Sequence, residues 1–352
     1  MNREKTKTIR AGDLSIGGVS PVSVQSMCNT KTEEIDATLA QIEALAKAGC
    51  DIVRLAVPNE KAARALPEIR RNCKVPLVAD IHFDYRLALS AVEAGFDKIR
   101  INPGNIGSNE RVKLVADACR ANGVPIRIGV NSGSLEKDLL EKLGPTPQAL
   151  CESAMRHVRM LEDLNFDDIC ISIKSSDVRD TVAAYRMISE MTDHPLHLGV
   201  TETGTAYMGI VKSAVGIGSL LMDGIGSTIR VSLTADPVEE VKAGIAILKA
   251  AGIRKDGVNI ISCPTCGRTN IDLIGTAAKV EELLKDFKRP LTVAVMGCAV
   301  NGPGEAKHAD YGLAGGMGEG VLFKKGEIVR KVPEFKLAQA LYELIMQEEK
   351  GV

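Results

Sequence analysis

The chain has 352 residues, a formal net charge of −1 and an aromatic content of 3% without tryptophan. The balanced charge does not indicate a nucleic-acid-binding surface, and the few aromatic residues argue against base stacking. No apolar run reaches the roughly 20 residues that a membrane-spanning helix needs, and residues 1–7 lack the apolar core of a signal peptide. We therefore expect a soluble cytoplasmic α/β protein without nucleic-acid or membrane partners.

Eight short runs rich in β-branched residues alternate with longer segments of helical period. The runs cover residues 22–27, 51–57, 75–82, 98–102, 125–131, 169–174, 196–201 and 228–233. Between them, apolar residues recur at three- and four-residue spacing and a glycine follows, as in residues 33–49 and 236–252. Eight such units ending near residue 252 predict a TIM-type (β/α)8 barrel rather than an open doubly wound sheet, because the number of units and the length both agree. A hairpin over residues 8–18 is expected to cap the barrel.

The pattern changes after the barrel and predicts a smaller α/β domain. Strands are expected over residues 259–262 and 291–296, helices over 271–287 and 335–348, and a hairpin over 321–331 that turns at Lys325 and Gly326. The glycine-rich residues 312–320 favour turns over a phosphate cradle, because no helix follows them. The predicted domains are residues 1–253 and 254–352.

One group of cysteines has the spacing of a metal site. Cys263-Pro-Thr-Cys266 supplies two thiolates from one turn, and Cys298 and Glu305 follow. A lone Cys-x-x-Cys pair also suits half of a zinc ribbon or a redox dithiol. A structural zinc site normally closes with four Cys or His ligands, whereas an iron-sulfur cluster held by three thiolates leaves one iron open. Three thiolates and one carboxylate therefore favour an open metal site.

The other six cysteines are scattered singly and are expected to be small buried hydrophobic residues. Cys28 is the exception, because it follows a strand end and could face a site. Nine cysteines are an odd number, so a disulfide framework is not expected and a reducing cytosol fits the chain.

Charged and polar side chains occur inside the predicted barrel strands. Alternation points every second side chain inward, and inward charges near the carboxyl ends of strands are typical of active sites in this fold. The residues are Arg54, Asp80, His82, Lys98, Arg100, Asn102, Arg127, Asn131, Ser172, Lys174, Thr201, Glu202, Arg230 and Ser232. Converging cations repel one another unless an anion lies among them, and guanidinium groups match phosphate oxygens. The pattern predicts a phosphate or diphosphate ester as substrate.

Each of these residues also has a structural interpretation. Any one strand arginine could pair with a helix carboxylate instead of a substrate. Glu202 could pair with Arg230, or it could donate or accept a proton. His82 and His197 could be ligands, although isolated strand histidines are more often hydrogen-bonded core residues.

Motifs along the whole chain resemble the bacterial 4-hydroxy-3-methylbut-2-enyl diphosphate synthase family, also called GcpE or IspG. They occupy residues 24–27, 79–82, 100–105, 129–133, 198–204, 229–232, 263–268 and 301–305. The short spacing between the two predicted domains resembles the two-domain bacterial form rather than the plant-type form with an inserted domain.

The resemblance implies an oxidoreductase of the non-mevalonate (MEP) isoprenoid pathway. Such enzymes convert 2-C-methyl-D-erythritol 2,4-cyclodiphosphate into the open-chain allylic diphosphate, with two electrons added and water lost. By motif position, Cys263, Cys266 and Cys298 would hold a 4Fe-4S cluster, and Glu305 would occupy its fourth iron while substrate is absent. Glu202 and Asn301 would deliver protons and orient groups near the cluster. The substrate-binding residues would be Arg54, Arg100, Arg127, Asn131, Lys174, Arg230 and Ser232.

The resemblance further implies partners. It suggests a head-to-tail homodimer in which the small domain of one subunit covers the barrel of the other. Flavodoxin or ferredoxin would be the electron donor, and the residues do not distinguish the two. Two other functions stay open from the residues alone: a non-catalytic iron-sulfur carrier or scaffold, and a zinc hydrolase with Cys3Glu ligation.

Overall fold

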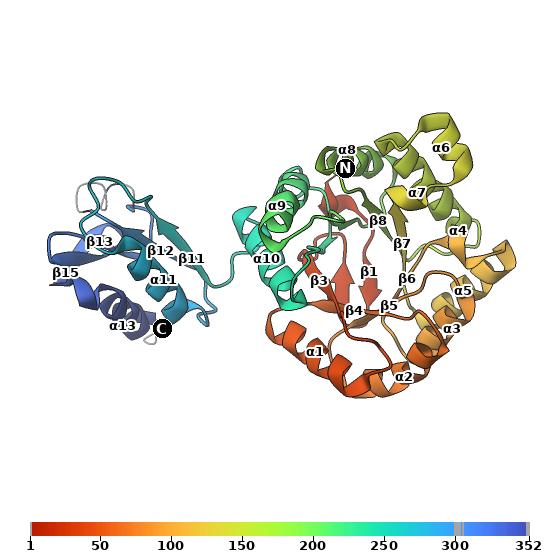
Figure 1. Ribbon diagram of the computed structural model, residues 1–352, viewed down its shortest axis with the longest axis horizontal. Coiled ribbons are helices and arrows are strands. Elements are labelled where there is room, and N and C mark those ends of the chain that lie inside the picture. Colours follow the sequence, from red (N-terminus) through yellow and green to blue (C-terminus); the bar gives the residue numbers. More distant parts are fainter. Residues whose placement is uncertain (1, 299–303, 305, 350–352) are drawn as a thin grey trace. The chain divides into compact units, whose positions relative to one another are not determined.

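The computed structural model describes residues 2–298, 304 and 306–349. It divides into two compact units, Met1–Ile253 and Arg254–Val352 (Figure 1). Within the described part of the chain, every helix is too short or too polar to span a bilayer.

The first unit is a parallel eight-stranded barrel surrounded by helices (Figure 1). Its strands are β3 (Ser23–Met27), β4 (Ile52–Ala56), β5 (Leu77–Asp80), β6 (Lys98–Ile101), β7 (Ile126–Asn131), β8 (Ile169–Lys174), β9 (His197–Leu198) and β10 (Thr228–Ile229). Their order in the sheet is β8-β7-β6-β5-β4-β3-β10-β9, and a parallel bridge between Ile171 and Leu196 joins the two ends. The predicted TIM-type barrel with eight strands is confirmed.

The helices lie outside the ring of strands. They are α1 (Ile35–Lys47), α2 (Glu60–Arg71), α3 (Tyr85–Glu93), α4 (Pro103–Ile106), α5 (Asn109–Asn122), α6 (Lys137–Leu143), α7 (Pro147–Glu162), α8 (Val178–Met191), α9 (Ala206–Met222) and α10 (Pro237–Ala250). Strand β7 shows how the sequence directs the two faces: Ile126, Ile128 and Val130 belong to the core shared with the helices. Alternation then points Arg127, Gly129 and Asn131 into the barrel.

The expected hairpin cap is present. Strands β1 (Ile9–Ala11) and β2 (Leu14–Ile16) pair antiparallel. Ile9 and Ile16 form a separate buried cluster with Ile52, Val78 and Cys170, which lie on three barrel strands. The hairpin therefore closes the end of the barrel that is opposite to the carboxyl ends of the strands.

Two barrel strands are shorter than the sequence pattern predicts. The runs at residues 196–201 and 228–233 form only His197–Leu198 and Thr228–Ile229 as strand. Beyond them, the polar residues leave the ladder: Glu202 has a φ of 53° and the hydroxyl of Thr203 donates to the carbonyl of Ser232. Their side chains and backbones bond across the two loops, so the regular strand pattern ends early.

The second unit is a five-stranded sheet with order β11-β12-β13-β14-β15. The strands are β11 (Val258–Ser262), β12 (Leu291–Met296), β13 (Tyr311–Gly315), β14 (Glu319–Lys324) and β15 (Glu327–Pro333). Helices α11 (Leu273–Leu284) and α13 (Leu337–Glu349) pack together on one face of the sheet. Strands β11, β12 and β13 run parallel, so the chain segments that follow β11 and β12 emerge at the same edge.

The glycine-rich stretch corrects one expectation. Residues 311–315 form strand β13 rather than a turn. Glycine is needed there for space, because a Cβ at Gly312 would lie 2.2 Å from the ring of Phe323 and one at Gly315 would lie 2.7 Å from Ile271. The predicted hairpin turn is confirmed, since Lys325 and Gly326 between β14 and β15 both have positive φ, as a two-residue hairpin turn requires.

Candidate functional site

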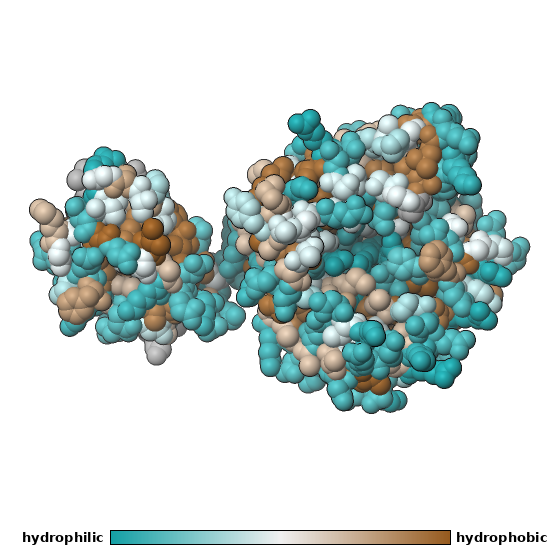
Figure 2. All heavy atoms as spheres, viewed as in Figure 1, coloured by the Kyte–Doolittle hydropathy of each residue, from teal (hydrophilic) through white to brown (hydrophobic). Residues whose placement is uncertain are grey.

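Five buried cations come from four strands and share the barrel interior. Arg54 lies on β4, Lys98 and Arg100 on β6, Arg127 on β7 and Lys174 on β8, and each residue is less than a tenth exposed. Arg100 is directly opposite Arg127 in the β6–β7 register. Figure 2 shows hydrophilic residues at the centre of the ring of helices. The barrel interior is therefore a charged site and not an apolar core.

Asp80 is the carboxylate that lies among these cations. Its Oδ1 is 3.1 Å from the Arg100 guanidinium, and its Oδ2 is 3.7 Å from that of Arg54. Oδ2 also lies 3.5 Å from Nε2 of His82. Burial opposes ionisation of Asp80, but the two guanidinium groups and the His82 contact outweigh it and hold the pKa of the carboxyl well below its usual range. Asp80 thus stays charged and orients Arg54 and Arg100.

The other interior cations have less compensation. The Nζ of Lys98 and the Nε and Nη1 of Arg127 have no hydrogen-bond partner among the described residues. Burial lowers the pKa of Lys98 to about 8 and that of Arg127 to about 10. Burial and the neighbouring arginines also lower the pKa of Lys174. Buried donors without partners are costly, so this arrangement suits an anionic ligand.

Two inward glycines make room for these cations. A Cβ at Gly129 would lie 2.5 Å from Nε of Arg100, and one at Gly199 would lie 3.1 Å from Nζ of Lys174. Glycine at both positions therefore lets the long cationic side chains extend across the interior. This role was not predicted from the sequence, although Gly129 alternates with the apolar residues of β7 and Gly199 directly follows β9.

Arg230 pairs with a helix carboxylate and not with Glu202. Its guanidinium lies 3.3 Å from Oε2 of Glu240 on α10. Asp236 caps that helix by accepting from the N–H of Val238, and Pro237 follows at the first helical position. The alternative in which Glu202 pairs with Arg230 is therefore wrong. The pairing with a helix carboxylate is present at Arg230, and its role in substrate binding stays a prediction.

Glu202 is exposed at the carboxyl end of the barrel. Its φ of 53° lies in the left-handed region, which a non-glycine residue rarely adopts and which often marks a functional site. The nearby loops are tied together, because Thr205 forms a parallel bridge with Thr234. Ser232 is half-buried in the second of these loops, and Asn131 is half-buried at the end of β7, opposite Lys174 in the register.

The two histidines of the barrel differ. His82 is half exposed and contacts both Asp80 and Arg100. His197 is buried on β9, and neither ring nitrogen has a hydrogen-bond partner among the described residues. Burial and the surrounding cations lower the pKa of His197 well below its usual value, so its imidazole is neutral at neutral pH.

The cysteines of the second unit lie where strands β11 and β12 end. Cys263 follows β11, Cys298 follows β12 by two residues, and the N–H of Gly297 donates to Sγ of Cys263 at 3.2 Å. A Cβ at Gly297 would lie 2.9 Å from Thr269, so glycine permits the close approach of the two segments. The turn that holds Cys266 therefore lies against the end of β12.

The thiol chemistry of this edge suits metal binding. Cys266 is exposed, and the backbone N–H of Arg268 lowers the pKa of its thiol. The N–H of Cys266 donates to Oγ1 of Thr269 at 3.2 Å, which fixes the turn. Free thiols, a lowered thiol pKa and N–H donors directed at sulfur are features of thiolate metal sites.

Comparison with known proteins covers both units. The GcpE TIM-barrel domain matches residues 6–245, and the GcpE protein C-terminal domain matches residues 259–347. The chain belongs to the GcpE family.

Two relatives that match almost the whole chain carry the same enzyme name. The 4-hydroxy-3-methylbut-2-en-1-yl diphosphate synthase (flavodoxin) of Geobacter sulfurreducens is 59% identical over 340 residues, which is 96% of each chain. The relative of the same name from Ruminiclostridium cellulolyticum is 57% identical over 348 residues, which is 99% of each chain. A solved phospho-2-dehydro-3-deoxyheptonate aldolase from Thermotoga maritima shares the barrel fold, with a TM-score of 0.51 and 13% identity over 72% of this chain and 77% of that one.

Two expected site residues of this GcpE-family chain lie outside the described residues. They are Asn301 and Glu305, which were predicted to act beside the cysteines. A third expectation concerned Cys28. It is 6% exposed in the barrel core, and burial raises the pKa of its thiol to about 12, so its thiol is a packed core group.

Two further features of the barrel unit lie outside the cationic interior. One described group, Glu162, Asp167 and His194, places three potential metal ligands within 4.8 Å of one another. The ammonium of Lys7 lies 2.8 Å from Asp167 and already supplies a cation there. These residues precede β8 and β9, at the end of the barrel away from the carboxyl ends of the strands.

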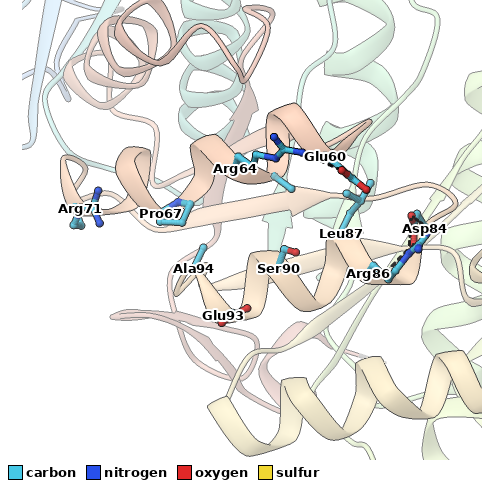
Figure 3. A pocket seen from close by; sticks show the side chains of 11 residues that line it. Glu60, Arg64, Pro67, Arg71, Asp84, Arg86, Leu87, Ser90, Glu93 and Ala94 are labelled. Atoms are coloured by element: carbon cyan, nitrogen blue, oxygen red, sulfur yellow. Dashed lines mark hydrogen bonds and ion pairs between the residues drawn. The ribbon is translucent and has the colours of Figure 1, made fainter.

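The second feature is a groove of about 670 Å³ between α2 and α3 on the outside of the barrel (Figure 3). Its lining has three arginines and three carboxylates: Arg64, Arg71, Arg86, Glu60, Asp84 and Glu93. Arg64 lies 3.2 Å from Glu60, and Arg86 lies 3.0 Å from Asp84. Because the opposite charges are equal in number, the groove lacks the excess of buried cations found inside the barrel.

Proposed function

We propose that the chain catalyses the reductive ring opening and dehydration of 2-C-methyl-D-erythritol 2,4-cyclodiphosphate to (E)-4-hydroxy-3-methylbut-2-enyl diphosphate. Counted as free acids, the substrate takes up two electrons and two protons and loses one oxygen as water. The enzyme name shared by relatives with almost full coverage supports the proposal. The observation that carries it is that one chain combines a barrel full of buried cations with a three-cysteine edge.

The barrel interior would hold the diphosphate. Arg54 and Arg100 are oriented by Asp80, whereas neither Arg127 nor Lys174 forms an ion pair with a carboxylate among the described residues. A diphosphate placed among these groups would accept their hydrogen bonds and offset their mutual repulsion. The full proposed set is Arg54, Arg100, Arg127, Asn131, Lys174, Arg230 and Ser232.

Glu202 is proposed as a proton-transfer residue. It lies at the carboxyl end of the barrel, where the active sites of this fold occur, and none of the described cationic side chains forms an ion pair with it. A free carboxylate beside bound substrate can hold or release a proton. Asn301 and Glu305 are proposed to act with it, on the basis of the family motif alone.

Cys263, Cys266 and Cys298 are proposed to hold a 4Fe-4S cluster, with Glu305 as the fourth ligand in the absence of substrate. The donor set fits, because all three thiols are free and the N–H of Gly297 supports the sulfur of Cys263. When bound, such a cluster supplies the electrons that the reaction consumes. The chain's own contribution is to fix the thiolates on two adjacent strand ends.

Flavodoxin is the proposed electron donor, because the names of the relatives include it. We propose a cytoplasmic location and a homodimer. An exposed apolar face on α9, with Tyr207, Val215 and Met222 all more than half exposed, supports association with a second copy.

Anaerobic turnover is the test of this function. Reconstituted protein would be given a reductant and the cyclodiphosphate, and the allylic diphosphate and the reduced-cluster spectrum would be followed together. The proposal expects product formation and a spectrum that substrate perturbs. A reduced-cluster spectrum that substrate does not change would favour an electron carrier or scaffold. Bound zinc without acid-labile sulfide would favour a Cys3Glu hydrolase.

A further inference from the structure

His157 on α7 contacts two loops that follow neighbouring barrel strands. Its Nε2 lies 3.3 Å from Oε1 of Glu136, in the loop between β7 and α6. Its Cε1 would lie 2.8 Å from a Cβ at Gly104, in the segment of residues 102–107 that follows β6 and contains the short helix α4, hereafter the β6 loop. The N–H of Gly104 in turn donates to Oδ1 of Asn102 at 3.1 Å. The imidazole is thus wedged between the two loops.

This contact is buried and has specific chemistry. His157 is 3% exposed, and neither carboxylate oxygen of Glu136 accepts a hydrogen bond from a described residue. Burial lowers the pKa of His157, while the carboxylate of Glu136 opposes that change. Arg156 lies 4.0 Å from Glu136 and 2.8 Å from Asp138, so the buried carboxylate depends mainly on the imidazole. Because the buried carboxylate of Glu136 has so few partners, removal of the imidazole would leave it uncompensated, which is costly.

The position of the wedge gives it a functional consequence. The β6 loop directly follows Arg100 and Asn102, and the β7 loop directly follows Asn131. A change in the spacing of these loops therefore changes the spacing of groups on two adjacent strand ends. Neither His157 nor Glu136 is part of the proposed binding set, and both lie outside the barrel interior.

We propose that Glu136 and His157 form a positioning pair that fixes the distance between the β6 and β7 loops and thereby arranges the diphosphate-binding groups. The functional part of this inference rests on the proposed function. Because the pair acts on groups that bind the diphosphate and not on electron transfer, its loss should weaken substrate binding more than it slows the chemical step. His157 is thus a positioning residue and not a catalytic one.

A pair of substitutions tests the wedge through its geometry. In Gly104→Ala, the added methyl must displace the imidazole, and the backbone at Gly104 does not itself exclude alanine because its φ is not positive. We expect KM for the cyclodiphosphate to rise roughly tenfold, less than the ~100-fold that a misplacement of 1 Å can cost. His157→Ala should raise KM by a similar factor, with kcat within about threefold of wild type.

The double variant gives the decisive comparison. When His157→Ala has removed the imidazole, the remaining near contact of the methyl in Gly104→Ala is with Oδ1 of Asn102 at 3.5 Å, an ordinary van der Waals distance, so the double variant should match His157→Ala alone. If Gly104→Ala raises KM by the same factor in the wild type and in the His157→Ala variant, the proposal is overturned. His157→Gln, which places a polar side chain of similar length next to Glu136, should restore most of the affinity. Gly218→Ala in α9, where a Cβ meets nothing within 4 Å, is the matched control.

Hydrogen exchange separates this inference from the proposed function. His157→Ala should speed amide exchange in residues 102–107 and 132–136 together, and Gly218→Ala should not. That result is expected whichever substrate the enzyme uses. Unchanged exchange in both loops would refute the wedge, whereas absent turnover of the cyclodiphosphate by the wild type would refute the proposed function alone.

Discussion

The guanidinium of Arg230, directly after strand β10, lies 3.3 Å from the carboxylate of Glu240 on helix α10. The same carboxylate accepts from the N–H of Leu233 at 2.9 Å and from the hydroxyl of Ser26 at 3.1 Å. One helix residue therefore links β10, its following loop and β3. The arginine is thus oriented before any ligand binds.

Glu240→Gln tests this link. The change keeps the shape but leaves the mostly buried Arg230 facing the other interior cations without its carboxylate. Because Arg230 retains some exposure, we expect a loss of about 2 kcal/mol in the free energy of unfolding, below the roughly 3–5 kcal/mol of a fully buried pair. Urea unfolding measures the loss, and the cyclodiphosphate should stabilise the variant more than it stabilises the wild type.

The control for Glu240→Gln is the surface pair of Arg186 and Asp223, which lie 2.8 Å apart. Asp223→Asn should cost less than about 1 kcal/mol, because exposed pairs contribute little. If Glu240→Gln and Asp223→Asn lower the free energy of unfolding equally, the contact between Glu240 and Arg230 stabilises the protein no more than an exposed ion pair does.

Lys98 is expected to reduce stability at neutral pH. Its pKa is lowered to about 8 by burial and by nearby Arg127 and Arg54. In the unfolded chain, Lys98 keeps its proton up to about pH 10.4, whereas in the folded protein it loses the proton near pH 8. The free energy of unfolding should therefore rise between about pH 8 and pH 10.4, because the folded protein no longer carries the buried charge. Lys98→Met should therefore stabilise the protein by about 1–3 kcal/mol at pH 7 and by much less at pH 10. Thermal unfolding at both pH values checks this.

A functional cost should accompany that gain in stability. The Lys98 ammonium adds positive potential to the site but forms no hydrogen bond with a described residue, so its loss should raise KM for the cyclodiphosphate a few-fold. A Lys98→Met variant that is no more stable than the wild type at pH 7 would show that the ammonium already has an anionic or solvent partner in the folded protein.

The barrel could be predicted from sequence because its strands alternate strictly. In β7, each inward Arg127, Gly129 or Asn131 is flanked by an apolar residue that faces a helix, and this period of two also identified the inward cations. The same pattern failed at β9 and β10, where the loops bond to each other through Thr203 and Ser232. Local periodicity contains no information on such contacts between distant segments.

The partners of the site residues were harder to predict. That Arg230 pairs with Glu240, and not with Glu202, depends on which helix position faces β10. The wedge of His157 and Glu136 was missed because its members are more than 20 residues apart and neither lies in a strand. Strand β13 was missed because glycine disfavours strands locally, although close packing on Phe323 requires it.

Asp80 should make the protein sensitive to acid. Its pKa is held far below the value of about 3.9 in an unfolded chain. A carboxyl with a lowered pKa contributes stability above the unfolded pKa and loses it as pH falls toward the folded pKa, so this contribution should decline below about pH 4. Asp80→Asn should cost about 3–5 kcal/mol at pH 7, because Arg54 and Arg100 lose their shared carboxylate.

Denaturation at pH 7 and pH 3 measures the difference in the free energy of unfolding between the wild type and Asp80→Asn. This difference should be smaller at pH 3. Phosphate in the buffer should restore part of the lost stability by binding the two arginines. A gap of constant size across this range would mean that Asp80 acts through packing rather than through its charge.

Glu202 should affect turnover without affecting the metal site. Glu202→Gln keeps the size of the side chain but cannot exchange a proton, so kcat should fall by about 100-fold or more while KM stays within a few-fold. Iron and sulfide contents should match the wild type. Because the backbone has a φ of 53°, Glu202→Asn is a useful second variant: asparagine tolerates that conformation well, and it should be equally inactive. Normal turnover by either variant would remove Glu202 from the proton path.

The three thiolates of the second unit should be needed together for the cofactor. Replacing Cys263, Cys266 or Cys298 by serine leaves a cluster with two thiolates, and we expect iron and acid-labile sulfide to fall by more than about tenfold in each variant. Cys73→Ala is the control, because this half-buried thiol lies in the barrel unit and should not alter either content. Since the sulfur of Cys263 accepts from the N–H of Gly297, its serine variant should also disturb the end of β12, whereas loss of the exposed Cys266 should not. Circular dichroism of the metal-free variants separates these effects: a fold retained in Cys266→Ser without iron identifies Cys266 as a ligand, and full iron in that variant contradicts the proposed set.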